Sequence, residues 1–278
     1  MNAVSPRHFS IVSSVLDART ANLSTDCDRK HRAMSKVVTT QRDRLVTELG
    51  SLDIFLDADG GTRTMLSEGS QLRSYAPDEL ILREGERPRH LFGIVDGLVA
   101  LGAHHHERET TLSLVERGRC LLLQAVVTDR VYLQSAKAIT SATVLAIPAA
   151  KFRTAIAREP GLAMATMRAV ASDHRDAIRD LKNIKLRSNA ERLANWILEN
   201  TRDDGRLELA INKKLLAERL GMTPESLSRC LRVLKPFGLV NHRDRLEVSD
   251  AALLRTFALP NALIDQGDGS RLERRATT

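Results

Sequence analysis

NKKLLAERLGMTPESLSRCLRVLKPFGLV, residues 212–240, is the stretch of this sequence whose pattern is most specific for one fold. It predicts two short helices joined by a tight turn. The first helix begins after Asn212, whose side chain can accept a hydrogen bond from the free N–H groups of a first turn, and it ends at Gly221. The second begins after Thr223, and Pro224 takes the first helical position, where a missing N–H does no harm. A link of about three residues between two helices is the geometry of a helix-turn-helix.

The second of these helices has two faces of opposite character at 100° per residue. Its apolar face can pack on the first helix and consists of Leu227, Leu231 and Leu234. Its polar face follows the steps i, i+3, i+4 and i+7 and consists of Glu225, Ser228, Arg229 and Arg232. A helix that reads DNA needs apolar residues inward and base-contacting residues outward near its N-terminal end. An ordinary solvated helix also has two faces, but less often together with these caps, this turn and the following Gly238.

The next segment, LVNHRDRLEVSD (239–250), alternates around a polar turn and predicts a β-hairpin beside the helices. The candidates for contacts to DNA phosphates or flanking positions are Lys213, Thr223, Arg232, Arg243 and Arg245. Phosphate contacts give affinity without sequence choice. A plain polar turn is the alternative for the hairpin. Residues 206–245 hold nine lysines and arginines and four acids, so this segment carries most of the net charge of +7.

The composition limits the function classes. A length of 278 residues suggests two domains at about 150 residues each. Hydrophobic residues make up 42% and aromatic residues 3%, so the cores must consist mostly of Leu, Val, Ile and Ala. No run of about 18 apolar residues and no apolar signal core occurs, so we expect a cytoplasmic protein that does not enter a membrane. The scattered cysteines Cys27, Cys120 and Cys230 predict neither a disulfide framework nor a zinc site.

Residues 51–148 have the pattern of short strands and turns. HLFGIVDGLVAL (90–101) holds two apolar runs split by Asp96-Gly97, which predicts a β-hairpin at that dipeptide. Several short strands at this spacing predict a small β-barrel or roll.

A long helical segment follows Pro160-Gly161. Its apolar positions recur at three- and four-residue steps and are Met164, Met167, Ala171, His174, Ile178 and Leu181. A narrow seam between charged flanks is typical of a helix that pairs with a second copy, so we expect a homodimer helix. Packing of the seam on its own domain is the alternative, and His174 is expected to be a packed residue. NAERLANWILENT (189–201) predicts a further amphipathic helix with Asn189 as its N-cap.

These segments together resemble the Crp/Fnr superfamily of bacterial transcription regulators. The E-x-x-S-R pattern of Glu225, Ser228 and Arg229 is similar to that of the FNR/FixK-like branch. GERPRHLFGIVDG (85–97) resembles the G-E-x(4)-L-x-x-I-x-x-G motif of the superfamily, and the resemblance extends from residue 67 to residue 254. It implies an α+β fold with an N-terminal β-roll (a cyclic-nucleotide-binding-like jelly roll), a long dimerisation helix and a C-terminal winged helix-turn-helix.

The expected domains are a loosely ordered extension (1–48), a β-roll sensor domain (49–159), the dimerisation helix (160–187), the winged helix-turn-helix (188–265) and a disordered tail (266–278). The resemblance implies that Arg229 donates two hydrogen bonds to guanine, Glu225 accepts one from cytosine, and Ser228 contacts a neighbouring base. It implies a homodimer on double-stranded DNA, at an inverted repeat with TTGA-like half-sites. RNA polymerase is the further partner expected of an activator, although the sequence leaves activation or repression open.

The effector is less defined. Cyclic-nucleotide-binding members carry a cassette with a glycine, a glutamate for the ribose, and an arginine before Ser/Thr-Ala for the phosphate. GRCLLLQAVVTDRVYLQSAKA (118–138) keeps Gly118 and Ser135-Ala136, but Leu122 or Gln124 replaces the glutamate and Gln134 the arginine. We therefore expect that cAMP is not the effector. Cys27 stands alone, which argues against a [4Fe–4S] cluster. The candidate axial ligands for haem are His90, His104, His105 and His106, with a solvated turn as the alternative.

Two other function classes compete with DNA binding. HHHERE (104–109) resembles the metal motif of a cupin enzyme through His104, His106 and Glu109, but the glutamate is one residue short of the usual spacing and no second histidine motif follows. We expect no enzymatic activity. A sensor that binds only a partner protein is the third reading, and salt dependence distinguishes it, because DNA binding weakens steeply as counterions are released.

Overall fold

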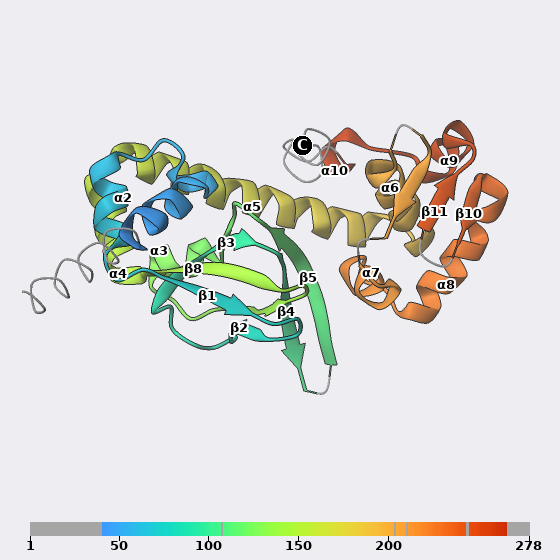
Figure 1. The fold of residues 1–278 in the computed structure, drawn as a ribbon. Helices are drawn as coiled ribbons and strands as arrows, with labels where there is room; N and C mark the ends of the chain where they lie inside the picture. Colours follow the sequence, from blue (N-terminus) through green and yellow to red (C-terminus); the bar gives the residue numbers. More distant parts are fainter. Residues whose placement is uncertain (1–40, 107, 203, 210, 243–244, 266–278) are drawn as a thin grey trace, which may run out of the picture.

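The computed structural model describes residues 41–106, 108–202, 204–209, 211–242 and 245–265. It has the α+β architecture predicted above, in which a β-roll and a C-terminal helical domain are joined by one long helix (Figure 1). The expected tail (266–278) and most of the expected extension (1–40) lie outside the described residues. None of the described helices is both long and apolar enough to cross a membrane.

The β-roll consists of two antiparallel sheets whose inner faces enclose an apolar core. In spatial order, the first sheet contains β1 (Gln71–Tyr75), β8 (Ala142–Pro148), β3 (His90–Asp96) and β6 (Cys120–Leu121). The second contains β2 (Leu80–Leu82), β7 (Ser135–Ala138), β4 (Leu98–His105) and β5 (Arg108–Glu116). The side chains that fill the space between the sheets include Ile81, Phe92, Ile94, Val99, Leu121 and Val144.

The hairpin predicted at Asp96-Gly97 is wrong. β3 pairs with β8 and β6, whereas β4 pairs with β5 and β7, so the chain crosses from one sheet to the other at this dipeptide. Gly97 has φ +95°, and a Cβ placed there would lie 2.6 Å from the carbonyl oxygen of Ser141. The sharp turn is real, but both strands bury apolar faces in one core and must therefore lie in facing sheets.

Gly97→Ala is expected to lower the free energy of unfolding by about 1–3 kcal/mol, because alanine is strained at this φ and its methyl group meets backbone. Urea unfolding followed by circular dichroism measures the change. Gly60→Ala is the matched control, since a Cβ at Gly60 has no neighbour within 4 Å and the residue opens a helix. Equal stability of the two variants would contradict this account of the crossing.

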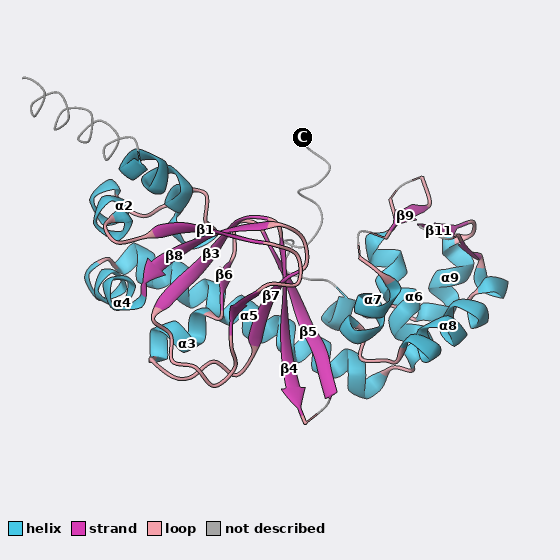
Figure 2. Cartoon of the chain, turned by 60° about the horizontal axis from the view of Figure 1, so that its bottom comes forward, coloured by secondary structure: helices cyan, strands magenta, loops and turns pink. Residues whose placement is uncertain are grey.

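Helices gather at one end of the roll (Figure 2). They are formed by residues 41–50 and by η1 (Asp53–Phe55), α2 (Gly60–Ser67), α3 (Leu123–Thr128) and α4 (Ala149–Arg158). Leu45 and Leu49 share a buried core with Phe55 and Phe152. The expectation of a loose segment up to residue 48 is therefore wrong for residues 41–48, because this helix has an apolar face that the core covers.

The long helix α5 (Pro160–Leu186) leaves the roll and reaches the C-terminal domain (Figure 1). That domain contains α6 (Asn189–Asn200), β9 (Arg206–Glu208), α7 (Lys213–Arg219), α8 (Pro224–Val233), η2 (Lys235–Phe237), β10 (Leu239–Asn241), β11 (Arg245–Val248), α9 (Ala251–Ala258) and α10 (Ala262–Asp265). Its three strands lie in the order β10-β11-β9. The N-cap of α6 is Ser188, not Asn189 as predicted. Ser188 and Glu191 form a reciprocal capping box, which satisfies two N–H groups and so outcompetes a cap one residue later.

Candidate nucleic-acid interface

The two helices α7 and α8 form the predicted helix-turn-helix. The Asn212 side chain accepts a hydrogen bond from the N–H of Leu215 (2.8 Å), and the Thr223 hydroxyl accepts one from the N–H of Ser226 (3.2 Å). Gly221, in the turn, has φ +62°. Both predicted N-caps are therefore confirmed. The apolar faces of the two helices meet in one core that contains Leu216, Leu220, Leu227, Leu231 and Leu234.

The polar face of α8 is open to solvent. Its exposed side chains are Glu225, Ser228, Arg229 and Arg232. Within the described part of the chain, the Arg229 guanidinium has no hydrogen bond or ion pair. The Ser228 hydroxyl donates to the carbonyl of Pro224 (2.9 Å), which leaves its oxygen able to accept. Hydrogen bonds from its own backbone N–H and from Thr223 lower the pKa of the Glu225 carboxyl, so this residue stays an ionised acceptor at neutral pH.

Residues proposed for the flanks of this surface have different placements. Lys213 donates to the side-chain oxygen of Asn241 (3.4 Å), which links the start of α7 to the β10–β11 hairpin. Thr223, Arg232 and Arg245 are exposed, while Arg243 lies outside the described residues. The described cations are therefore Arg232 on α8, Lys213 on α7 and Arg245 on the β10–β11 hairpin.

A buried arginine stabilises the turn of the helix-turn-helix, a role that was not predicted from the sequence. Arg192, on α6, donates from Nε to the carbonyl of Leu220 (2.9 Å) and from Nη2 to the carbonyl of Gly221 (3.2 Å). Its Nη2 also donates to Asn189 Oδ1 (2.6 Å), and its Nη1 donates to the carbonyl of Arg187 (3.0 Å). Burial lowers its pKa, but these acceptors satisfy the cation. The available sequence signal was an arginine directly before the apolar Leu193.

The roll contacts the helix-turn-helix directly. The Thr111 hydroxyl on β5 donates to the Glu218 carboxylate on α7 (2.9 Å), and β5 packs beside α7 (Figure 1). A hollow of about 470 Å³ lies at this contact, between the β4–β5 hairpin and the start of α8. The roll and the helix-turn-helix of one chain are therefore in physical contact outside α5.

The predicted seam of α5 is exposed along its whole length. All six of its members are solvent-accessible in the single chain: Met164, Met167, Ala171, His174, Ile178 and Leu181. The opposite face of the helix is buried against the roll and its helices through Leu162, Thr166 and Asp176. The alternative that the seam packs on its own domain is therefore wrong. His174 is exposed in the single chain like the other members of the seam.

Comparison with known proteins agrees with this geometry. The model of the cyclic nucleotide-binding domain matches residues 72–159, and the model of the Crp-like helix-turn-helix domain matches residues 191–257, together more than half of the chain. The chain belongs to the Crp/Fnr superfamily. Among curated proteins, none gives a significant match.

Solved structures of Crp/Fnr proteins have the same fold. A candidate cAMP-binding regulatory protein from Silicibacter pomeroyi is 26% identical, with 78% of this chain and 100% of that chain covered and a TM-score of 0.50. FixK2 from Bradyrhizobium japonicum is 20% identical, with 69% and 99% covered and a TM-score of 0.60. A candidate Crp/Fnr-family regulator from Eubacterium rectale is 20% identical, with 76% and 100% covered and a TM-score of 0.62.

In this Crp/Fnr chain, part of the segment that corresponds to the nucleotide cassette is packed into the core. Leu122 is buried in a left-handed conformation, with φ +46°, and Leu123 begins α3 inside the core. The Ser135 hydroxyl accepts a hydrogen bond from the N–H of Glu84 (3.0 Å). The buried Tyr132 donates to the carbonyl of His90 (3.2 Å). Leu122 is therefore part of the core of the roll, and the Ser135 hydroxyl already accepts a hydrogen bond from within the chain.

The histidines proposed as haem or metal ligands have different surroundings. His90, on β3, packs beside the Phe92 ring, and burial, then Arg73 and Arg89, lowers its pKa. His104, on β4, lies 3.3 Å from the Glu84 carboxylate, and the rings of His105 and His106 contact each other. No group of three or more His, Cys, Asp or Glu residues within the described part of the chain is arranged to hold a metal ion.

The cupin alternative has no support here. Its three candidate ligands are His104, His106 and Glu109. His104 pairs with Glu84, as described above, and Glu109 forms an ion pair with Lys137 (3.4 Å). Two of the three predicted ligands thus pair with other side chains.

The two cysteines that the structure describes are packing residues. Cys230 is 7% exposed and belongs to the core of the helix-turn-helix, and burial raises its pKa. Burial also raises the pKa of Cys120 to about 12. A thiol with a raised pKa is protonated at neutral pH and is a poor nucleophile.

Cys120 is expected to react with iodoacetamide at pH 7.5 at least about 100-fold more slowly than free glutathione, because only the thiolate attacks. Residue-resolved mass spectrometry of the folded protein measures the rate. Mild oxidation is expected to leave DNA affinity unchanged, and Cys230→Ser serves as the control. A fast reaction at Cys120, or an oxidation effect that Cys230→Ser removes, would contradict the packing role.

Proposed function

We propose that this Crp/Fnr transcription regulator binds an inverted repeat with TTGA-like half-sites as a homodimer, one half-site per protomer, in the manner of the FNR/FixK-like branch. The observation that carries the proposal is the open face of α8. This face presents the Glu225 carboxylate, the Ser228 hydroxyl and the Arg229 guanidinium, and the guanidinium has no partner among the described residues. The proposal makes the protein a cytoplasmic regulator rather than an enzyme, with RNA polymerase as a further partner.

The three side chains have distinct roles in this proposal. Arg229 donates two hydrogen bonds to O6 and N7 of guanine, Glu225 accepts from the N4 amino group of cytosine, and Ser228 contacts a neighbouring base or thymine methyl group. Thr223, Arg232, Lys213, Arg243 and Arg245 contact the backbone or flanking positions and contribute affinity and register.

The homodimer is proposed to form along the exposed seam of α5. The seam exposes six side chains, most of them apolar, over about five turns of the helix. Exposing this apolar surface to water is unfavourable, and a second copy of the same helix covers it. The pairing places two α8 helices on one duplex, which is why the target is an inverted repeat.

The β-roll is proposed not to bind cAMP. It either binds another effector or has lost effector binding. The support is the lack of a charged side chain at the two cassette positions, where Leu122 or Gln124 and Gln134 stand, and the hydrogen bond that the Ser135 hydroxyl already accepts. Calorimetric titration with cAMP is expected to give no binding up to millimolar concentration. Micromolar affinity would overturn this part alone. The proposal includes neither haem nor a [4Fe–4S] cluster.

Selection of bound duplexes from a random pool, followed by titration at several salt concentrations, tests the main proposal. The enriched sequences should contain a two-fold repeat, and the logarithm of affinity should fall with the logarithm of salt by about 0.9 for each phosphate contacted. No enrichment, together with salt-insensitive binding of a protein, would favour a sensor that acts only through a partner protein.

A further inference from the structure

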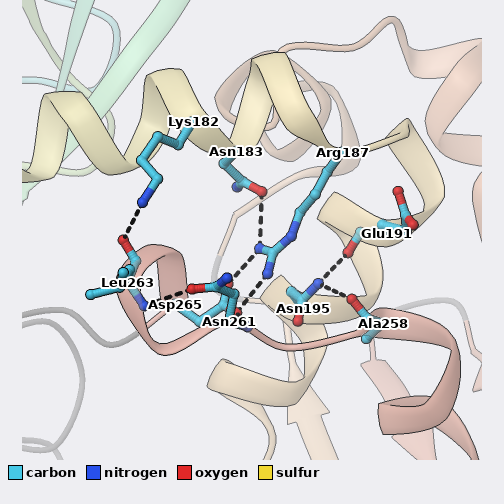
Figure 3. A network of polar contacts seen from close by, with 9 residues as sticks. All are labelled: Lys182, Asn183, Arg187, Glu191, Asn195, Ala258, Asn261, Leu263 and Asp265. Atoms are coloured by element: carbon cyan, nitrogen blue, oxygen red, sulfur yellow. Dashed lines mark hydrogen bonds and ion pairs between the residues drawn. The ribbon is translucent and has the colours of Figure 1, made fainter.

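The chain after the winged helix returns to the junction between the dimer helix and the DNA-binding domain. We name the seven residues Leu259–Asp265 the strap. The chain reverses at Leu259, which has φ +47°, and α10 then packs on α5 (Figure 3). Only Arg187 and Ser188 separate the end of α5 from the start of α6, so the strap lies on a two-residue hinge.

A buried ion pair fastens the strap to this hinge. Arg187 donates from Nη1 to Asp265 Oδ1 (2.5 Å) and from Nη2 to Asp265 Oδ2 (2.7 Å), as Figure 3 shows. The two side chains are only 7% and 13% exposed. Two parallel bonds fix direction as well as distance, which a single contact does not. Arg187 also donates to Asn183 (3.2 Å), and Asp265 accepts from the N–H of Asn261 (2.6 Å) and has a side-chain hydrogen bond with Glu199 on α6.

Two further bonds tie the neighbouring elements. Lys182, on α5, donates to the carbonyl of Leu263 in the strap (3.3 Å). Asn195, on α6, donates to the carbonyl of Ala258 at the end of α9 (2.7 Å). The strap therefore contacts α5 directly and begins at a point that is anchored to α6, so it bridges the two sides of the hinge (Figure 3).

The same hinge is connected to the reading helices. The carbonyl of Arg187 accepts a hydrogen bond from Arg192, and Arg192 holds the carbonyls of Leu220 and Gly221 in the helix-turn-helix turn. A rotation at Arg187 would break either the bonds to Asp265 or the bond from Arg192. The ion pair, the hinge and the turn are thus one connected set of contacts.

We propose that Arg187 and Asp265 are positioning residues that lock the hinge, so that the strap sets the direction of α8 relative to α5 and thereby the half-site spacing that a dimer accepts. A hinge of two residues without such a lock would let each recognition helix swing about the end of its dimer helix. A locked hinge makes both helices meet the duplex at one separation, which selects one spacer length between half-sites. The inference rests on the proposed function, because spacing has meaning only for a DNA-binding dimer.

The test compares Asp265→Asn with wild type on duplexes that carry the selected repeat with its own spacer or with spacers longer or shorter by one or two base pairs. Asp265→Asn is expected to lose about 5- to 150-fold in affinity for the native spacer, and much less for the altered ones, so that discrimination between spacers shrinks. Asp129→Asn is the matched control. It removes the carboxylate of another arginine pair, with Arg153, that lies in the roll.

A second variant and a second measurement separate positioning from loss of fold. Lys182→Ala removes a different strap contact and should shrink discrimination in the same direction. Hydrogen exchange of peptides that span residues 183–190 should accelerate in both variants, while peptides of the roll stay unchanged. Equal loss of affinity at every spacing, or wild-type exchange at the hinge, would overturn the inference. If wild type selected no DNA, the proposed function would fail, and the exchange measurement would still decide whether the strap locks the hinge.

Discussion

Arg229→Ala is expected to weaken binding of the selected repeat by about 1–3 kcal/mol, or roughly 5- to 150-fold in Kd. The Arg229 guanidinium projects from the open face of α8 with no partner among the described residues, so its five donors are available to a base edge. Alanine removes both of the bonds proposed to guanine and leaves the helix intact, since Leu227 and Leu231 carry the packing. The loss should concentrate at one base position, where the variant accepts any pair.

Fluorescence anisotropy with a panel of duplexes, each changed at one position, measures this effect. Arg255→Ala is the matched control, because Arg255 is an exposed arginine on α9, off the reading face. Arg245→Ala is a second comparison. It should weaken binding to all sequences alike and reduce the salt slope by about one. If Arg229→Ala bound as tightly and as selectively as wild type, the base-reading role of Arg229 would be excluded.

Leu181→Glu is expected to convert the dimer to a monomer. Leu181 lies in the exposed seam of α5 and is 50% exposed in the single chain. Burial of one leucine contributes about 1.5–3 kcal/mol, so the loss of both copies raises the dimer dissociation constant by roughly 10²- to 10⁴-fold. The two new carboxylates also repel each other across the interface. Light scattering coupled to size exclusion should give a mass near the 30.8 kDa of one chain.

The matched control is Leu133→Glu. It makes the same substitution at a leucine that is 77% exposed in the loop before β7, away from the seam. This variant should remain a dimer with unchanged DNA affinity, whereas Leu181→Glu should lose most of its affinity because one protomer contacts one half-site. A dimeric Leu181→Glu protein would show that the copies meet elsewhere.

The features predicted correctly from the sequence are those with a local cause. Asn212 and Thr223 cap their helices through bonds to residues three positions later, and such short-range chemistry is readable in the sequence. The two faces of α8 follow from periodicity alone, as does the exposed row of side chains on α5. The family resemblance then supplied the order of the elements, which local patterns do not determine.

The features that were missed depend on contacts between distant segments. The turn at Asp96-Gly97 is local. The sheet to which each flanking strand belongs, however, is set by distant partners, since β3 pairs with β8 and β4 pairs with β7. The strap has no sequence signature, because Arg187 and Asp265 are 78 positions apart. Arg192 lies on the apolar side of α6, and only the carbonyls of the distant turn explain why a cation is tolerated there.

The pairing of β1 with β8 has a consequence for synthesis of the chain. Gln71 lies opposite Ala146. After β1 is synthesised, the ribosome must therefore add about 75 further residues before β8 can pair with it, which takes roughly 4–15 s. During that interval β1 has an unpaired edge that can join another strand. The nascent roll is therefore a stage at which this protein is exposed to aggregation, and a chaperone that shields residues 71–75 is expected to raise its yield.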